Sequence, residues 1–406
     1  MGTIIVIGAG PAGIMAALTA AKKGESVLLI DRNKQAARKL FISGSGQCNL
    51  THSGDISSFS LHYGEKSKVA FRILRRFSNE DLIDFFKNLG LPLKKRDDGK
   101  YFPKSLKSSN VISCLLKTLE SNAVQLILNN SVISIEKSNN VFLVTTKKEK
   151  YTAKCVICAT GGFTYPKTGS DGKFFSIIEK MNHHIVPLGK GLSPIFTKDN
   201  DLKRLAGISF KNAAIGFKTK NNKPINARGE LLVTHHGFSG PLILDYSRYF
   251  QKGMKIHLNF TPFKDRNELE KQMIAYTKAH GKNTVVSFFQ KNAIPKRLII
   301  TLFQRINIDM RITFSQLSSP NRKQLSEVFA DYKTTIESLG NINESMVTTG
   351  GIDLKEIKLS TMESKIIKGL YFCGEMIDID GDSGGYNIQM AFSTGFIAGQ
   401  ATSQSA

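Results

Sequence analysis

The pattern of apolar and polar positions is most regular near the start of the chain. Residues 4–7 (IIVI) and 27–30 (VLLI) are short apolar runs with β-branched side chains, which predicts two buried strands. Between them, residues 11–21 are crowded with small side chains over the length of a helix, and Gly24 can end that helix. The turn at residues 8–13 reads GAGPAG. Strand, glycine turn, helix and strand in this order predict a dinucleotide-binding βαβ unit.

Each glycine of this turn has a mechanical reason. Gly8 permits the tight turn, Gly10 lets a pyrophosphate approach the backbone, and Gly13 lets the helix pack closely on the strand. The helix N-terminus at Ala12 offers free N–H groups and a partial positive charge to phosphates. Asp31 follows the second strand, where a carboxylate would accept hydrogen bonds from an adenosine ribose. The sequence therefore predicts a nucleotide cofactor along this unit.

The periodicity changes along the rest of the chain. Residues 124–161 contain short apolar runs separated by polar turns, which predicts strands. Alternating short strands follow Leu192, whereas residues 263–340 have helical periodicity. Cys155 and Cys158 form a CxxC, but residues three apart on a strand point to opposite faces. We therefore expect neither a disulfide nor a metal site there.

Charge is the outlying feature of the composition. The 406 residues carry 56 Lys and Arg against 33 Asp and Glu, a formal net charge of +23. Such an excess attracts polyanions, although a lysine-rich proteome with solvated surfaces would give the same count. Residues 65–107 hold 12 basic against 6 acidic side chains, and Tyr101 and Phe102 are interleaved with them. This pattern is typical of an RNA-binding surface, and the alternative is a solvated face over a packed aromatic pair.

Other features bear on the compartment. The five cysteines are scattered and odd in number, which favours a reducing cytoplasm over a disulfide framework. The first predicted strand follows Met1 and Gly2 at once, so we expect no signal peptide. No apolar run approaches the ~18 residues that would span a bilayer. We expect a cytoplasmic protein with no membrane partner.

Several motifs beyond the first turn are more specific. Residues 38–51 read RKLFISGSGQCNLT, where glycines among small polar residues suit a backbone that passes close to a ligand. This stretch resembles the GRKLLISGGGRCNLTN signature of the BaiN/RdsA-like family of NAD(P)/FAD-dependent oxidoreductases. Ala37 and Ser45 replace glycines of that signature, and Gln47 replaces its arginine. Further segments that resemble the family are residues 99–103, 163–170, 230–241, 348–352, 361–365 and 369–389.

The resemblance covers the chain from end to end and implies an α/β fold. It implies a Rossmann-like FAD-binding domain built from both chain ends, with an inserted β-rich domain and a small inserted helical domain. We expect the FAD domain at residues 1–190 and 345–406, a β-rich substrate domain at 191–262 and a helical domain at 263–344, with the inserts roofing the substrate cleft. A second GxGxxG unit is missing, so NAD(P)H would dock transiently as the reductant. The residues assigned to FAD by the first turn and by the resemblance are Gly8, Gly10, Ala12, Gly13, Asp31, Arg32, Lys39, Gly44, Asn49, Val132, Ala159, Thr160, Gly161, Gly374, Glu375, Gly385, Asn387 and Ile388.

The resemblance also implies a reaction. The family includes proteins similar to ribosomal RNA dihydrouridine synthases, and the chain is basic. The leading hypothesis is therefore an NAD(P)H-driven reductase of a C=C bond, with uridine in ribosomal RNA as substrate. Cys48 is the candidate acid that protonates the substrate, and His235 matches a family histidine that could act as acid or base. The alternatives are a small-molecule flavin oxidase or enone reductase, and a non-enzymatic flavin-containing RNA-binding factor.

Overall fold

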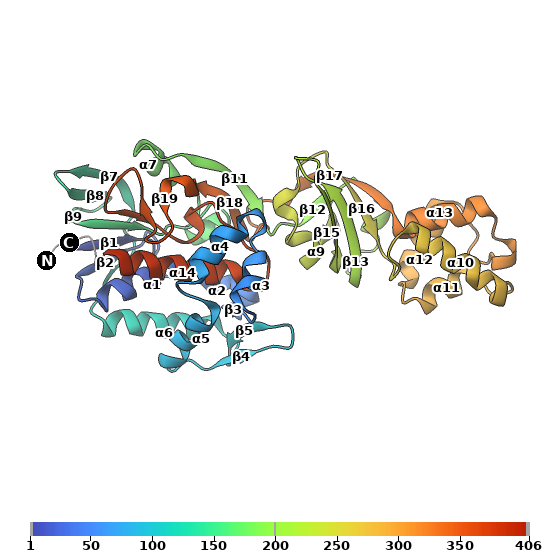
Figure 1. Cartoon of the computed structure of the whole chain (residues 1–406), viewed down its shortest axis with the longest axis horizontal. Helices are drawn as coiled ribbons and strands as arrows, with labels where there is room; N and C mark the ends of the chain where they lie inside the picture. Colours follow the sequence, from blue (N-terminus) through green and yellow to red (C-terminus); the bar gives the residue numbers. More distant parts are fainter. Residues whose placement is uncertain (1–2, 199, 403–406) are drawn as a thin grey trace. The chain divides into compact units, whose positions relative to one another are not determined.

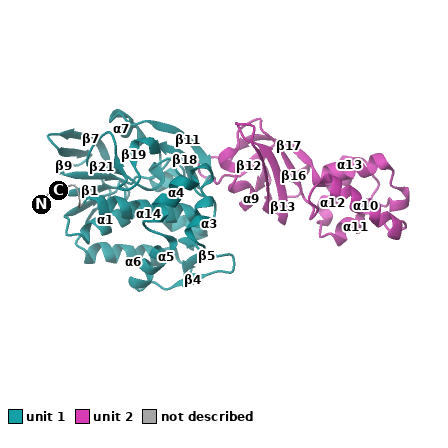
Figure 2. Ribbon diagram, viewed as in Figure 1, with its two compact units in different colours: residues 1–191, 345–406 teal, residues 192–344 magenta. Residues whose placement is uncertain are grey.

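The computed structural model describes residues 3–198 and 200–402. The chain divides into two compact units (Figure 2). Unit 1 combines Met1–Gly191 with Ser345–Ala406, and unit 2 is the single inserted segment Leu192–Glu344. Unit 1 is thus built from both chain ends, and the β-rich and helical segments of the insert share unit 2.

The central sheet of unit 1 has the strand order β19-β20-β21-β10-β1-β2-β6. Strands β1, β2 and β10 are wholly buried and apolar, as a parallel sheet covered on both faces requires. Because the carboxyl ends of parallel strands meet at one edge, the turns that follow these strands lie side by side. The parallel strands are β1 (Ile4–Ile7), β2 (Val27–Ile30), β6 (Gln125–Ile127), β10 (Cys155–Cys158) and β21 (Leu370–Phe372), and the antiparallel ones are β20 (Glu363–Ser364) and β19 (Ile357–Lys358).

Helix α1 (Pro11–Ala21) packs against α14 (Tyr386–Ala401), which comes from the other end of the chain (Figure 1). A Cβ on Gly395 would lie 2.2 Å from the carbonyl oxygen of Ala12, and a Cβ on Gly399 would lie 2.4 Å from that of Ala16. The order of these contacts makes the two helices parallel. At 1.5 Å per residue, the N-terminus of α14 then extends about 12 Å beyond that of α1. Two helix N-termini therefore point to the same side, one displaced from the other along the common axis.

Smaller elements complete unit 1. The capping box expected at Ser78 and Asp81 is present at the start of α5 (Asn79–Asn88) and is confirmed. A small sheet of order β3-β5-β4 carries a hairpin that Figure 1 shows at the edge of the unit. The elements are α2 (Arg38–Ile42), β3 (Thr51–His52), α3 (Ile56–Leu61), α4 (Ser67–Leu74), β4 (Leu93–Lys95), β5 (Lys100–Pro103), α6 (Ser108–Ser121), β7 (Val132–Ser138), β8 (Val141–Thr146), β9 (Lys150–Ala153), α7 (Phe175–Lys180), β11 (Ile185–Gly191) and β18 (Val347–Ile352).

Unit 2 contains a closed barrel of order β12-β15-β14-β13-β16-β17 and a group of helices. The expectation of helix up to residue 340 is wrong at its end. Helix α13 (Ser319–Ala330) stops, and β17 (Tyr332–Leu339) pairs with β16 and β12. The reason is that Thr334 and Ile336 are β-branched and alternate with exposed residues. The other elements are β12 (Ile195–Thr197), α8 (Asn200–Lys203), β13 (Ser209–Lys218), β14 (Pro224–Val233), β15 (Gly237–Ser239), α9 (Pro241–Leu244), β16 (Lys255–Asn259), α10 (Arg266–His280), α11 (Val285–Lys291) and α12 (Lys296–Arg305).

Within the described residues, every helix is too short or too polar to cross a lipid bilayer.

Candidate cofactor site

In the glycine turn between β1 and α1, the protein's own backbone requires two of the glycines, whereas the third leaves space for a ligand. Gly8 has φ +104°, and a Cβ there would lie 2.4 Å from the carbonyl oxygen of Ala159. A Cβ on Gly13 would lie 1.8 Å from the carbonyl oxygen of Gly8. The protein's own backbone therefore requires both glycines. A Cβ on Gly10 would meet no atom within 4 Å, so that face of the turn is open to a ligand.

Helix α1 begins in the manner of an anion-binding helix. Gly10 is its N-cap and contributes no side-chain hydrogen bond, and the first turn holds no acidic residue. The N–H groups at the start of a helix need acceptors, and its positive end favours a negatively charged one. The open face at Gly10 and the bare start of α1 at Ala12 together fit a pyrophosphate.

Asp31 supports this turn from the adjacent strand. One carboxylate oxygen accepts a hydrogen bond from the Ala9 N–H at 2.7 Å, and the other accepts one from the Asn33 N–H at 2.7 Å. The side chain is buried, and this desolvation raises the pKa of Asp31 despite the two backbone hydrogen bonds. The carboxylate thus holds the glycine turn in place, next to the edge where the adenosine end of the cofactor was expected.

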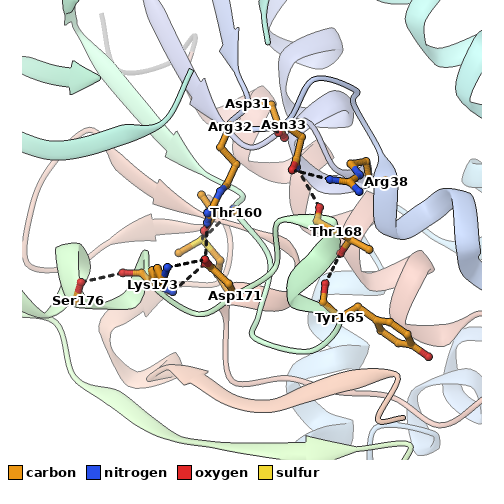
Figure 3. A network of polar contacts seen from close by, with 11 residues as sticks. Asp31, Arg32, Asn33, Arg38, Thr160, Tyr165, Thr168, Asp171, Lys173 and Ser176 are labelled. Carbon is orange, nitrogen blue, oxygen red and sulfur yellow. Dashed lines mark hydrogen bonds and ion pairs between the residues drawn. The ribbon is translucent and has the colours of Figure 1, made fainter. Parts of the chain in front are cut away.

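A second polar network fixes the segment that faces the end of β2 (Figure 3). Arg32 pairs with Asp171 at 2.8 Å, and the Asn33 amide donates to the Thr168 carbonyl at 3.0 Å. Both Thr160 N–H and Thr160 Oγ1 lie 3.2 Å from the sulfur of Met376. Arg32 is therefore engaged with the protein itself, and the contacts bring residues from three turns of the sheet edge together.

Buried polar atoms without a partner mark the path between these segments. Among the described residues, Asn130 Oδ1, Ser170 Oγ and Asn49 Oδ1 are buried and have no hydrogen-bond partner. Asn130 donates its N–H to the Asp31 carbonyl, and Ser170 Oγ would lie 3.2 Å from a Cβ on Gly161. Buried polar groups are normally hydrogen-bonded, so unpartnered ones beside a glycine turn fit the hydroxyls and phosphates of a cofactor.

Lys39 and Glu375 form a partly buried ion pair that joins four segments. Lys39 Nζ lies 2.9 and 2.8 Å from the two Glu375 oxygens and 2.8 Å from Thr164 Oγ1. Glu375 also accepts the Thr348 N–H at 2.7 Å, and Thr348 Oγ1 accepts the Phe163 N–H at 2.9 Å. Both charged groups, expected to touch FAD, therefore bind one another. Their contacts position α2, the segment after β10, β18 and the turn at 374–376.

No side chain of the described residues caps the start of α14. Its N-cap, Gly385, has φ +101°, and a Cβ there would lie 2.8 Å from Thr51 Cα. The first turn has no acidic residue, and Ile388 within it is half-buried. The amide of Asn387 is hydrogen-bonded to the preceding loop. Its Oδ1 accepts the Gly381 N–H at 2.8 Å, and its Nδ2 donates to the Gly381 carbonyl at 2.7 Å. This N-terminus fits the electron-rich flavin ring of FAD, which a ribityl chain connects to the pyrophosphate.

The remaining expected cofactor residues also lie in unit 1. Gly374 donates its N–H to Thr394 Oγ1 at 2.9 Å, and a Cβ on it would lie 2.7 Å from Ala12 Cβ. Val132 begins β7 and is half-buried, two residues after Asn130, whose Oδ1 has no hydrogen-bond partner. Gly44 contacts Asn49 closely, since a Cβ on Gly44 would lie 3.1 Å from the Asn49 nitrogen. The fold thus brings the expected cofactor residues from both chain ends into unit 1.

The structure does not support Cys48 as the acid. Its side chain is 0% exposed, so the protein's own atoms enclose the thiol. Burial raises the pKa of Cys48 to about 12, which makes the thiol a weak acid at neutral pH. The enclosed thiol therefore has no open path to a substrate in this structure, and its role as the acid stays a prediction.

His235 belongs to unit 2, whereas the residues described above belong to unit 1. It occupies the exposed turn between β14 and β15. His235 is thus accessible, and its part in chemistry stays a hypothesis.

Sequence reasoning missed Asn130 and Ser170. Asn130 follows β6, the neighbour of β2 in the parallel sheet, so the rule that ligands bind at the carboxyl ends of strands could have found it. Ser170 belongs to a loop of irregular backbone, and only the fold places it beside Gly161.

Comparison with known proteins agrees with this geometry. The family model of the HI0933-like protein Rossmann domain matches residues 2–401. The chain belongs to this family. It is 30% identical over 405 residues to a ribosomal RNA dihydrouridine synthase of Escherichia coli K12, covering 98% of this chain and 96% of the relative. It is 28% identical over 412 residues to a 3-dehydro-bile acid delta(4,6)-reductase of Clostridium scindens, covering 100% of both.

A solved structure supports the fold of this HI0933-like chain. A flavocytochrome c3 fumarate reductase superposes with a TM-score of 0.52 at 17% identity, covering 100% of this chain and 78% of that one. The prediction of an FAD-dependent oxidoreductase with a Rossmann-like domain is confirmed at the level of the family.

Proposed function

We propose that this protein is an NAD(P)H-driven reductase that converts uridine in ribosomal RNA to dihydrouridine. The observation that carries the proposal is the similarity, along the whole of both chains, to a ribosomal RNA dihydrouridine synthase. The net charge of +23 is consistent with a polyanionic substrate. Saturating the C5–C6 bond of uridine adds one hydride and one proton, which NAD(P)H and the solvent can supply.

Residues of unit 1 would bind FAD and hold the segments around it during the reduction. The bare start of α1 and the open face of Gly10 would bind the pyrophosphate of FAD, and the start of α14 would face the ring system. The Lys39–Glu375 pair would hold the surrounding segments in register. A bound FAD would supply the hydride chemistry, which no side chain of the protein can provide.

A second candidate, a small-molecule enone reductase, has its own observation in favour. The relative named as a bile acid reductase is matched over its whole length. Its name and that of the RNA enzyme both describe saturation of a C=C bond conjugated with a carbonyl. The reaction type is therefore common to both candidates, and the substrate separates them.

The deciding experiment compares ribosomal RNA from cells with and without the gene by mass spectrometry. The proposal expects one fragment to be lighter by about 2 Da in the deletion strain, the mass of the two hydrogens that hydride transfer and protonation add. Wild-type protein should restore it, and a Gly10→Ala variant, which we expect to lose FAD, should not. Purified protein with NADH or NADPH should reproduce the modification and identify the reductant. Identical RNA in both strains would contradict the proposal and favour the small-molecule candidate.

A further inference from the structure

Residues 37–49 contain Lys39, Gly44 and Asn49, which the resemblance assigns to FAD, and we call this segment the flavin loop. A surface at this segment combines basic and exposed apolar side chains. It comprises Lys94 on β4, Lys104 and Lys107 in the turn before α6, and the apolar residues Phe41, Ile42 and Leu106; we call it the basic rim. Backbone contacts join its parts, since Lys104 N–H donates to Pro92 O at 2.8 Å and Ser108 Oγ donates to Phe41 O at 2.7 Å. These hydrogen bonds link the segments that carry the rim, next to the hairpin β4–β5 (Figure 1).

The cations of the rim are not neutralised by the chain. Among the described residues, no carboxylate lies within ion-pair distance of Lys94, Lys104 or Lys107, and all three side chains are exposed. The hairpin tip is different, because Asp98 pairs with Lys100 at 2.8 Å and Asp97 is exposed. Uncompensated lysines spaced along a surface suit successive phosphates of a polynucleotide. This charge pattern excludes the acidic tip from the phosphate path.

The apolar residues of the rim are exposed to an unusual degree. Phe41 is 54% exposed, Ile42 40% and Leu106 38%. Leu106 also has φ +54°, which is strained for a residue other than glycine. Leu106 thus combines a positive φ with an exposed apolar side chain. An exposed aromatic ring among lysines is the arrangement that proteins use to stack bases of single-stranded nucleic acid.

A guanidinium connects the hairpin to the flavin loop. Arg96 donates a hydrogen bond to Gln47 Oε1, and its guanidinium carbon lies 3.8 Å from the centroid of the Phe102 ring. Phe102 is buried beneath it, so Phe102 is not available for base stacking. Gln47 stands where the resembling signature has arginine, and Arg96 thus returns a positive charge to that place from another element. These contacts link the hairpin β4–β5 to the loop at residues 43–49.

We propose that the basic rim binds the single-stranded RNA that flanks the target nucleotide, with the lysines on phosphates and Phe41 stacked on a base. The proposal rests on the proposed function, because it takes RNA as the substrate. It differs from the sequence-based expectation, which assigned stacking to Tyr101 and Phe102. Phe41 and Ile42 of the rim directly precede residues 43–49 in the chain, so an RNA held there keeps a neighbouring nucleotide close to the flavin loop.

The experiment measures binding of a fluorescein-labelled oligouridylate of about 20 nucleotides to the FAD-loaded protein by fluorescence anisotropy. The test variant is Lys104→Glu with Lys107→Glu, and the matched control is Lys147→Glu with Lys148→Glu, two exposed lysines in the turn between β8 and β9. We expect the test pair to raise the Kd by about tenfold and to lower the slope of log K against log salt by about 2, with the control within about twofold.

A second pair tests stacking without changing the charge. Phe41→Ala should raise the Kd by about tenfold, whereas Ile366→Ala, which truncates an apolar side chain 47% exposed elsewhere in unit 1, should leave it unchanged. Equal effects of the rim variants and their controls would overturn the rim as the RNA site and leave only diffuse attraction by net charge. The two proposals can fail separately. Identical ribosomal RNA in the two strains would contradict the reductase proposal, while weaker oligouridylate binding by the rim variants would still support the rim as an RNA-binding surface.

Discussion

The glycine turn at residues 8–13 and the flavin loop at residues 37–49 both bend the backbone sharply, but they tolerate substitution differently. In the first, Gly8 and Gly13 stand where a Cβ would collide with backbone atoms at 2.4 and 1.8 Å. In the second, Ala37 and Ser45 occupy positions of φ +56° and +55°, where the resembling signature has glycine. A collision with fixed backbone excludes every side chain, whereas a positive φ costs about 1–2 kcal/mol. The cofactor turn is therefore constrained by packing and the flavin loop by local conformational energy.

The largest predicted effect is a loss of stability, and it distinguishes Gly13 from Gly10 in the first turn. Gly13→Ala should destabilise unit 1 by more than about 3 kcal/mol, because the new Cβ would lie 1.8 Å from the Gly8 oxygen. Gly10→Ala has room for its Cβ and an extended backbone at φ −84°, so it should fold normally and lose FAD. Thermal unfolding of the apoprotein and the flavin absorbance of the purified protein measure the two effects. Full flavin content in Gly10→Ala would contradict the placement of the pyrophosphate.

The same contrast shows which features can be predicted from the sequence and which need the fold. The GAGPAG turn was predictable because each glycine follows from a mechanical need within one βαβ unit. The ribose contact of Asp31 stays a prediction, and its hydrogen bond from the Ala9 N–H was not foreseen. The contact of Arg96 with Gln47 was not predictable either, because it joins two loops that only the fold brings together. Strand β17 was missed because Tyr332 extends the apolar stripe of the preceding helix, which hid the change of period.

The second prediction concerns the Lys39–Glu375 pair, whose side chains are 26% and 21% exposed. Removing one partner leaves the other charge partly buried, so Lys39→Met or Glu375→Gln should each lower the free energy of unfolding by about 2–3 kcal/mol and weaken FAD binding. The double variant should recover part of this loss. Lys87→Met is the control, since it breaks an ion pair whose side chains are 61% and 65% exposed and should cost less than about 0.5 kcal/mol. Additive losses in the double variant would show that the two charges act independently.

The third prediction uses the pKa of Cys48, raised by burial to about 12 from an ordinary 9.0. The folded protein then keeps this proton at pH values where the unfolded chain releases it. Stability contributed by the thiol is complete below pH 9 and is lost as the pH rises toward 12. Between about pH 8 and 10.5, wild type should lose about 2 kcal/mol more than Cys48→Ala in denaturant unfolding.

Turnover of Cys48→Ala provides the functional half of that test. With FAD content equal to wild type, we expect turnover to stay within about threefold, because a buried weak acid has no part in proton transfer. A loss of a hundredfold or more would restore Cys48 as the acid and require an alternative state of the loop.

The fourth prediction reverses the two departures from glycine in the flavin loop. Ala37→Gly and Ser45→Gly should each raise the free energy of unfolding by about 1 kcal/mol, because glycine adopts positive φ without the steric penalty. Ala21→Gly at the end of α1 is the control and should lower it by about 1 kcal/mol, since glycine disfavours helix. If both loop variants were destabilising, the strain at these positions would be offset by contacts of the side chains.

The smallest effect on stability is expected at His235, and it tests whether unit 2 contributes to chemistry at all. The side chain lies exposed in the turn between β14 and β15, so His235→Ala should change the free energy of unfolding by less than about 0.5 kcal/mol. Any change in turnover then reports chemistry or substrate binding and not folding. We expect kcat to fall by about tenfold or more if the histidine transfers a proton. Unchanged kcat with FAD bound would confine the reacting groups to unit 1, where the glycine turn, the ion pair and the start of α14 already lie.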